Sequence, residues 1–218
     1  MAQTLVGIYG ASGLGREVLP LVRAQLLAVD TDFVFVDDGD VGASVNGYRV
    51  LSYQQFLASD SPVKQIVFAI ADGKVRESLA QKCSNDGIPV LSVRADNVVV
   101  LDDVSIDEGA ILSHFTQLTS NIRIGKHFHA NIYSYVAHDC VIGDYVTFAP
   151  SVRCNGNIII EDHAYIGTGA IIKQGTPDKP LVIGRGSVVG MGAVVTKDVP
   201  PGVTVVGNPA KVFAPRKS

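Results

Sequence analysis

The sequence predicts two dissimilar domains, an α/β Rossmann-like domain over residues 1–96 and a parallel β-helix of hexapeptide repeats over residues 97–218. Three observations support this prediction. Strand-like and helix-like segments alternate in the first half, and a glycine-rich turn follows the first predicted strand. From Val100 onward, an aliphatic or small apolar residue recurs at every sixth position.

The first half of the chain alternates between apolar runs and helical segments. We expect strands at residues 4–9, 32–36, 65–71 and 89–93, and helices at 16–27, 53–58 and 74–84. Strands that alternate with helices are typical of a parallel sheet with crossover connections. This pattern predicts a small Rossmann-like domain.

The turn at residues 10–15, with the sequence GASGLG, is a candidate phosphate-binding loop. Its glycines permit close backbone approach, and the N-terminus of the following helix offers free N–H groups to an anion. Asp37 and Asp38 follow the second strand, where an acidic residue can bind a ribose hydroxyl. The spacing departs from G-x-G-x-x-G, so a nucleotide or nucleotide sugar is favoured over NAD. A tight turn with no ligand is the alternative.

The second half carries an apolar anchor in a six-residue register. The anchors are Val100, Ile106, Leu112, Leu118, Ile124, Ala130, Val136, Ile142, Phe148, Cys154, Ile160, Ile166 and Ile172, then Ile183, Val189 and Val195 after a slip of five residues. A period of six matches neither an α-helix nor simple strand alternation. It fits a β-helix with one hexapeptide per side and three sides per coil, so that residues 18 apart stack about 4.8 Å from each other. The slip at 174–180 predicts a loop at one corner.

The segment HDCVIG at 138–143 contains the most informative histidine. Histidine is the usual general base near neutral pH, and a carboxylate partner can orient its ring. Asp139 can serve His138 only where a bend brings the two side chains together, because neighbours in a strand point to opposite faces. Gly156 lies one coil further and is expected to leave room for a thioester beside the imidazole. A surface histidine without a catalytic role is the alternative.

Composition excludes several classes of protein. The net charge of −3 argues against a nucleic-acid partner, and no apolar run approaches the ~18 residues that span a membrane. The beginning of the chain lacks signal-peptide features, and the three cysteines suggest reduced, buried thiols in a cytoplasmic protein. The histidines show no metal-binding pattern, so no metal is expected.

Taken together, the glycine turn, the Asp37–Asp38 pair, the hexapeptide array, the HDCVIG segment and the tail GNPAK at 207–211 resemble one family over nearly the whole chain. It is the hexapeptide-repeat sugar acyltransferase family of sialic acid O-acetyltransferases and bacterial UDP-amino-sugar N-acetyltransferases. The chain looks most similar to its UDP-N-acetylbacillosamine N-acetyltransferases, which acetylate the 4-amino group of a UDP-4-amino-4,6-dideoxy-N-acetylglucosamine.

The resemblance implies a left-handed β-helix, a homotrimer with active sites between subunits, and acetyl-CoA as co-substrate. It makes His138 the general base, Asp139 its acidic partner, and the backbone N–H of Gly156 the donor to the thioester carbonyl. The implied UDP-amino-sugar contacts are Ser12, Gly13, Leu14, Asp37, Asp38, Ala71 (in a segment 69–72 that closes over the nucleotide) and Asn131. The implied acetyl-CoA contacts are Thr147, Gly156, Thr168, Gly190, Met191, Pro209 and Lys211.

The chain departs from the bacillosamine-type pattern at three positions. Asp139 replaces a glutamate, Thr147 replaces a histidine that contacts acetyl-CoA, and Leu14 replaces a histidine in the glycine turn. The alternative functions are sugar O-acetylation of the sialic acid type, a non-catalytic trimeric scaffold and, more remotely, a nicotinamide-dependent dehydrogenase.

Overall fold

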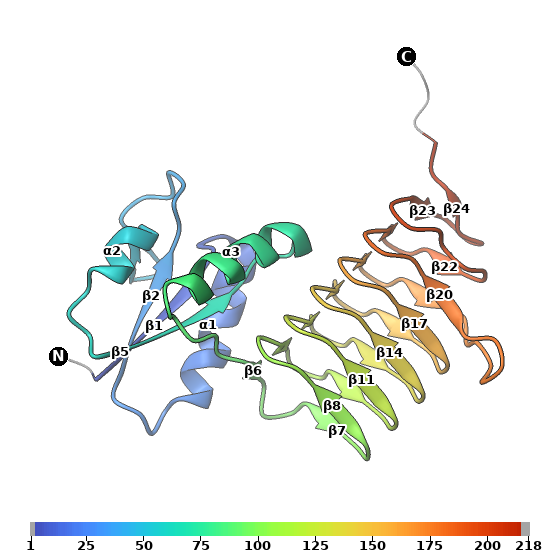
Figure 1. Cartoon of the computed structure of the whole chain (residues 1–218), viewed down its shortest axis with the longest axis horizontal. Coiled ribbons are helices and arrows are strands. Elements are labelled where there is room, and N and C mark those ends of the chain that lie inside the picture. The colour runs from blue at the N-terminus through green and yellow to red at the C-terminus, as the bar shows by residue number, and fades with distance from the viewer. Residues whose placement is uncertain (1–2, 215–218) are drawn as a thin grey trace.

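The computed structural model describes residues 3–214 and consists of an α/β domain followed by a left-handed parallel β-helix. The two parts lie one after the other along the longest axis of the molecule (Figure 1). No helix in the described range is long and apolar enough to cross a membrane.

The N-terminal sheet has the strand order β3-β4-β2-β1-β5. Its strands are β1 (Thr4–Tyr9), β2 (Thr31–Val36), β3 (Ser44–Val45), β4 (Tyr48–Leu51) and β5 (Val63–Phe68), and its helices are α1 (Gly13–Gln25), α2 (Tyr53–Leu57) and α3 (Gly73–Asn85). All strand pairs are parallel except β3–β4, and every residue of β1 is buried. The prediction of a Rossmann-like domain is confirmed.

Three details differ from the sequence-based prediction. The β3–β4 hairpin was not predicted, although Asn46-Gly47, with φ of 48° and 81°, is a strong hairpin signal. Helix α1 begins at Gly13 rather than at residue 16, because Ser12 is the extended N-cap. The strand expected at 89–93 is wrong: only Val90 bridges to the N-terminal sheet, and Val93 pairs with a strand of the β-helix.

The β-helix has three faces, and each face is a parallel sheet. The one antiparallel pair among the described strands of these faces is β23–β24, at the end of face 1. Face 1 comprises β6 (Val93–Arg94), β9 (Ile111–Leu112), β12 (His129–Ala130), β15 (Thr147–Phe148), β18 (Tyr165–Ile166), β21 (Val188–Val189), β23 (Thr204–Val206) and β24 (Lys211–Val212). Face 2 comprises β7 (Val99–Val100), β10 (Gln117–Leu118), β13 (Tyr135–Val136), β16 (Arg153–Cys154), β19 (Ile171–Ile172) and β22 (Val194–Val195). Face 3 comprises β8 (Val104–Ile106), β11 (Ile122–Ile124), β14 (Cys140–Ile142), β17 (Ile158–Ile160) and β20 (Leu181–Ile183).

The predicted anchors fill the interior of this prism. All of them from Leu112 to Val195 are buried, while Val100 and Ile106 in the first coil are half-buried. The residue three positions before an anchor has a left-handed backbone conformation along most of the array, as at Asp139, with φ of 58°. These residues turn the chain from one face to the next, so that each side of the prism contains six residues.

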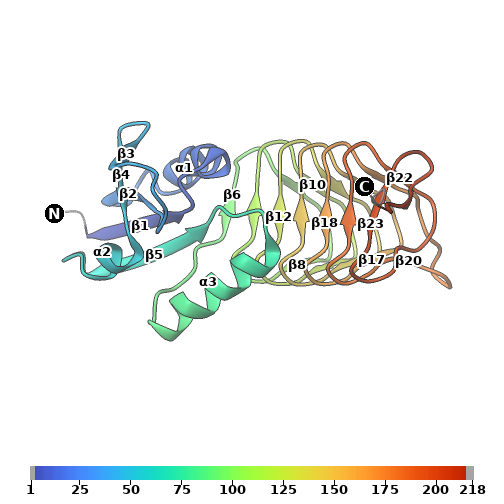
Figure 2. The ribbon, with the colours of Figure 1, turned by 90° about the horizontal axis from the view of Figure 1, so that it is seen from above.

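The two domains are joined by a fully buried arginine. Arg76 of α3 donates hydrogen bonds to the carbonyl oxygens of Ile70 (2.6 Å), Tyr145 (2.8 Å) and His127 (3.1 Å). Burial lowers the pKa of Arg76 to about 10, so the guanidinium remains charged at neutral pH. The contact holds the N-terminal end of α3 and the preceding segment against the β-helix, as Figure 2 shows.

Candidate active site

The corners of the prism, where one face passes into the next, form three edges along its axis. The edge between faces 1 and 2 contains residues 131–134, 149–152, 167–170 and 190–193. The edge between faces 2 and 3 contains residues 137–139, 155–157, 173–180 and 196–198. The edge between faces 3 and 1 contains residues 125–128, 143–146 and 161–164.

His138 and Asp139 form a hydrogen-bonded pair on the edge between faces 2 and 3. The Nδ1 atom of His138 lies 2.7 Å from Oδ2 of Asp139, and each side chain is about half exposed. The left-handed conformation of Asp139 supplies the bend that the sequence predicted and brings the adjacent side chains together. The pairing favours a proton on Nδ1 and leaves the Nε2 lone pair free to accept a proton.

A third residue, which was not predicted from the sequence, orients the carboxylate. Asn121, one coil before Asp139, donates its side-chain amide to Oδ1 of Asp139 at 3.0 Å. The hydrogen bonds from His138 and Asn121 lower the pKa of Asp139, which keeps this carboxylate ionised at neutral pH. The spacing of 18 residues between Asn121 and Asp139 could have indicated this contact, since residues 18 apart stack on successive coils.

Gly156 lies directly beneath the imidazole. A Cβ atom at Gly156 would lie 2.5 Å from Cε1 and 2.6 Å from Nε2 of His138, so only glycine fits there. The glycine therefore accommodates the ring itself rather than leaving the expected space beside it. Within the described residues, the backbone N–H of Gly156 donates to no protein acceptor and is available to a ligand.

The predicted nucleotide loop is assembled by the two aspartates. Asp37 accepts hydrogen bonds from the backbone N–H groups of Ala11 (2.9 Å) and Gly39 (3.0 Å). Asp38 accepts from the Tyr9 hydroxyl at 2.6 Å and from the backbone N–H of Tyr53 at 2.8 Å. The structure thus brings the strand end at 37–38 to the glycine turn.

The start of α1 is suited to an anion. Ser12 makes no side-chain capping bond, and the first turn, which contains Gly13 and Leu14, has no acidic residue. No acidic side chain of the helix itself therefore offsets the positive end of its dipole, while the Asp37 carboxylate accepts from the Ala11 N–H just before the helix.

Ala71 and Thr147 meet in a groove of about 380 Å³ between the start of α3 and face 1. The Thr147 hydroxyl donates a hydrogen bond to the carbonyl oxygen of Ala71 at 2.8 Å, so its proton is already engaged. Tyr165 and Val188 continue the groove along face 1.

The other predicted residues lie on a different edge or near the last strands. Asn131, Thr168, Gly190 and the exposed Met191 all lie along the edge between faces 1 and 2. The Asn131 side-chain amide donates to the carbonyl oxygen of Phe148 at 2.9 Å. Pro209 and Lys211 lie in and beside β24. One chain therefore does not bring its His138 pair together with these residues or with the Ala71–Thr147 groove.

His127, His129 and the three cysteines are buried inside the protein, whereas His163 is half-buried and His114 is exposed. Burial, with the nearby Arg76 charge, lowers the pKa of His127 to about 4, and burial lowers that of His129 well below its usual value. Cys83, Cys140 and Cys154 are free and buried, as predicted for structural thiols. Among residues 3–214 no cluster of three or more histidine, cysteine or acidic side chains is arranged to hold a metal ion.

Comparison with known proteins identifies the family. Residues 6–83 match the model of the PglD N-terminal domain. GDP-perosamine N-acetyltransferase of Escherichia coli O157:H7 is 50% identical over 210 residues, which cover 95% of each chain.

Two solved structures have the same fold over almost the whole chain. WeeI from Acinetobacter baumannii AYE is 62% identical, with a TM-score of 0.94 over 96% of this chain and all of that one. The acetyltransferase domain of PglB from Neisseria gonorrhoeae FA1090, in complex with acetyl coenzyme A, is 28% identical, with a TM-score of 0.85 over 98% of this chain and all of that one. The resemblance inferred from the sequence is confirmed, and the chain belongs to the family of hexapeptide-repeat sugar acyltransferases that includes GDP-perosamine N-acetyltransferase.

Proposed function

We propose that the protein transfers the acetyl group of acetyl-CoA to the amino group of a nucleotide-linked 4-amino-4,6-dideoxyhexose. The observation that carries the proposal is the position of the His138 imidazole over Gly156, with Asp139 hydrogen-bonded to Nδ1 and the Gly156 N–H not used by the described residues. The acetylating relatives with the same fold support it.

The proposed reaction is direct transfer without an acyl-enzyme. The amine attacks the acetyl carbonyl while Nε2 of His138 takes a proton, and the Gly156 N–H donates to the developing oxyanion. The tetrahedral intermediate then expels the CoA thiolate, which receives a proton from the imidazolium. Asp139 stabilises that imidazolium. The burial of all three cysteines argues against a covalent cysteine intermediate.

Asn121 acts in this scheme as a positioning residue. It occupies Oδ1 of Asp139, so that Oδ2 is directed at His138 Nδ1 and the ring is held over Gly156. A carboxylate held at both oxygens has little freedom to rotate away, which preserves the orientation of the base.

The nucleotide is assigned to the loop built from the glycine turn and Asp37–Asp38, with the diphosphate at the start of α1. Two acceptors have the required chemistry. UDP-4-amino-4,6-dideoxy-N-acetylglucosamine corresponds to the resemblance seen in the sequence, and GDP-perosamine is named for the relative with 50% identity. Both present a 4-amino group on a 6-deoxyhexose, but they differ in base and at C2.

We further infer that the complete site forms between copies of the chain in a homotrimer. The Ala71–Thr147 groove lies on face 1, whereas His138 lies on the edge between faces 2 and 3. A neighbouring copy that presents its His138 edge to this groove would unite base, thioester and nucleotide sugar. Sedimentation at nanomolar protein is expected to give a trimer, and a monomer under those conditions would contradict the intersubunit site.

The test of the proposed function is thiol release from acetyl-CoA with a panel of acceptors. The panel contains the UDP-linked amino sugar, GDP-perosamine, the corresponding 4-hydroxy sugar nucleotides and sialic acid. We expect rapid release with at least one of the two amines and an amide product. Release only with hydroxyl acceptors would replace N-acetylation by O-acetylation, and no release with any acceptor would favour a scaffold.

A further inference from the structure

The peptide group between Asn155 and Gly156 carries the N–H that the proposed reaction uses. Within residues 3–214 this N–H donates to no protein acceptor. The peptide is trans, so its carbonyl oxygen and its N–H point in opposite directions. Whatever holds the Asn155 carbonyl therefore also determines where the Gly156 N–H points.

The Asn155 carbonyl accepts a hydrogen bond from a buried thiol. Cys140 Sγ lies 3.1 Å from the Asn155 oxygen and 3.5 Å from the carbonyl oxygen of His138, so the Asn155 oxygen is its nearer acceptor. Cys140 is fully buried in the prism. The Asn155 carbonyl therefore points inward, and the Gly156 N–H points outward to where a ligand can reach it. The Cys154 thiol is also buried, but it lies 3.9 Å from the same oxygen, too far for a strong hydrogen bond.

A thiol at position 140 differs from its neighbours on face 3. The register of β14 places Cys140 between Ile122 and Ile158, which are buried in the same way. An isoleucine at position 140 would bury more apolar surface, but it has no hydrogen-bond donor in its side chain. The one donor among these three stacked residues is therefore the one that contacts the peptide of Gly156.

The side chain of Asn155 is held as well. Its Nδ2 donates to the carbonyl oxygen of Ile172 at 2.7 Å, and its Oδ1 accepts from the Tyr135 hydroxyl at 2.8 Å. The two partners belong to face 2, one in the coil before Asn155 and one in the coil after it. These bonds limit rotation of the peptide that follows Asn155.

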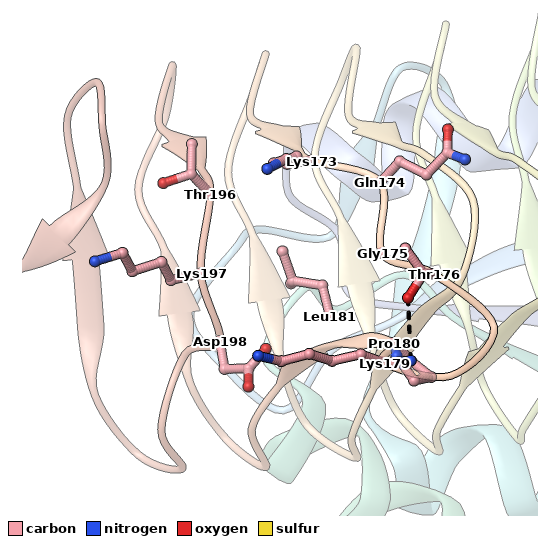
Figure 3. Close-up of a pocket in the computed structure, with 10 residues that line it drawn as sticks. All are labelled: Lys173, Gln174, Gly175, Thr176, Lys179, Pro180, Leu181, Thr196, Lys197 and Asp198. Carbon is pink, nitrogen blue, oxygen red and sulfur yellow. Dashed lines mark hydrogen bonds between the residues drawn. The ribbon is translucent and has the colours of Figure 1, made fainter.

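On the other side of this peptide, the Gly156 carbonyl oxygen accepts a hydrogen bond from the Gly175 N–H at 3.0 Å. Gly175 lies near the start of the loop drawn in Figure 3, which is closed by backbone hydrogen bonds between Thr176 and Lys179 at 3.0 Å. The backbone is therefore fixed before and after the Gly156 N–H, while the N–H itself is left free.

We propose that Cys140 is a positioning residue for acetyl transfer, because its thiol holds the Asn155 carbonyl and thereby directs the Gly156 N–H at the thioester oxygen. This role rests on the proposed function, in which that N–H donates to the oxyanion. The buried thiol forms no covalent bond, and its hydrogen bond polarises the shared peptide so that the N–H becomes a stronger donor. The oxyanion exists only near the transition state, so the effect falls on kcat rather than on the KM for acetyl-CoA.

Cys140→Ala and Cys140→Ser separate this role from a purely structural one. Both variants are smaller than the wild type at this position, but only serine keeps a donor. We expect alanine to lower kcat about tenfold with an unchanged KM for acetyl-CoA, and serine to keep kcat within about threefold of the wild type. In urea denaturation the serine variant should be no more stable than the alanine variant, because its hydroxyl is polar and buried. Cys154→Ala, which removes the neighbouring buried thiol, is the matched control and should keep kcat near the wild-type value.

A second measurement detects the hydrogen bond without turnover. The amide nitrogen resonance of Gly156 responds to hydrogen bonding at the Asn155 carbonyl, because the two groups share one peptide. In protein labelled at glycine nitrogen, Gly156→Ala identifies this resonance by removing it. Cys140→Ala should shift the resonance, whereas Cys140→Ser should shift it less.

The outcomes distinguish the role of Cys140 from the proposed function. Wild-type kcat in Cys140→Ala, serine no more active than alanine, or an unmoved Gly156 resonance would overturn the positioning role and leave the acetyltransferase proposal standing. A wild type that acetylates no acceptor would overturn both. If Cys140→Ala folds poorly, Cys140→Val fills the interior as the neighbouring isoleucines do; slow turnover by a stable valine variant supports the role, and wild-type turnover refutes it.

Discussion

Replacing Gly156 by alanine is the substitution that most specifically disturbs the proposed catalytic geometry. The added Cβ would lie 2.5 Å from Cε1 of the His138 ring, whereas ordinary contact begins at 3.4 Å. The ring must therefore move by about 0.9 Å, the difference between these two distances. Displacement of a catalytic group by about 1 Å can reduce the rate about 100-fold, so we expect kcat to fall by roughly that factor.

The same substitution should hardly affect folding. Gly156 is outside the left-handed region, and the half-exposed imidazole can swing toward solvent. The free energy of unfolding is therefore expected to change by less than about 1 kcal/mol.

Thiol release from acetyl-CoA measures kcat, and urea denaturation measures the stability of Gly156→Ala. The matched control is Gly156→Ala in a His138→Ala background, where the added methyl meets no ring and should cause little further loss of activity. A variant that retains wild-type kcat would refute the argument, because the base could not then depend on its position over Gly156.

Further predictions concern the orientation of the base, the buried histidine and the domain contact. Asn121→Gly, which keeps the left-handed conformation accessible, should lower kcat about tenfold and leave the KM for acetyl-CoA unchanged. Asn46→Gly, at another left-handed asparagine, is the matched control. An effect of Asn121→Gly on stability alone would contradict a positioning role. Asp139→Asn should lower kcat at least about 100-fold, and near-normal turnover would exclude Asp139 as the partner of the base. His127 is protonated near pH 6.5 in the unfolded chain but only near pH 4 in the folded chain. Between these two values the free energy of unfolding should therefore fall by about 1.4 kcal/mol for each pH unit of acidification. His127→Gln should reduce that slope in urea titrations at several pH values, and an unchanged slope would contradict it. Thr147→Val should destabilise the protein by about 1 kcal/mol in the same assay, since it removes the bond to the Ala71 carbonyl; equal stability would show that bond to be inconsequential.

The β-helix was predictable because its period directly reports which residues enter the prism. An anchor such as Ile142 or Phe148 is apolar for the same reason that it is buried, and three sides per coil then give the stacking of Gly156 on His138. The alternating elements of the first domain were predictable from their apolar runs. The ends of these elements were not predictable. The strand expected at 65–71 stops at Phe68, because the residues after it form the segment that Arg76 holds against the β-helix.

The site was predictable in its residue types and less so in its geometry. The sequence pointed to His138, Asp139 and Gly156, but the pairing of neighbouring side chains depends on a left-handed backbone at Asp139. Asn121 is an ordinary corner residue until the stacking places it against that carboxylate. The separation of His138 from the Ala71–Thr147 groove arises from the assembly of the two domains, which a linear repeat does not encode.

The role of His138 as the base is tested most directly by the kcat of the His138→Asn variant with the better of the two amino-sugar acceptors, measured together with the affinity of that variant for CoA. The asparagine side chain occupies part of the space of the imidazole, but its amide cannot take the proton of the attacking amine. We expect kcat to fall at least about 100-fold while CoA binding stays within a few-fold of the wild type. Turnover near the wild-type rate would show that His138 is not the base.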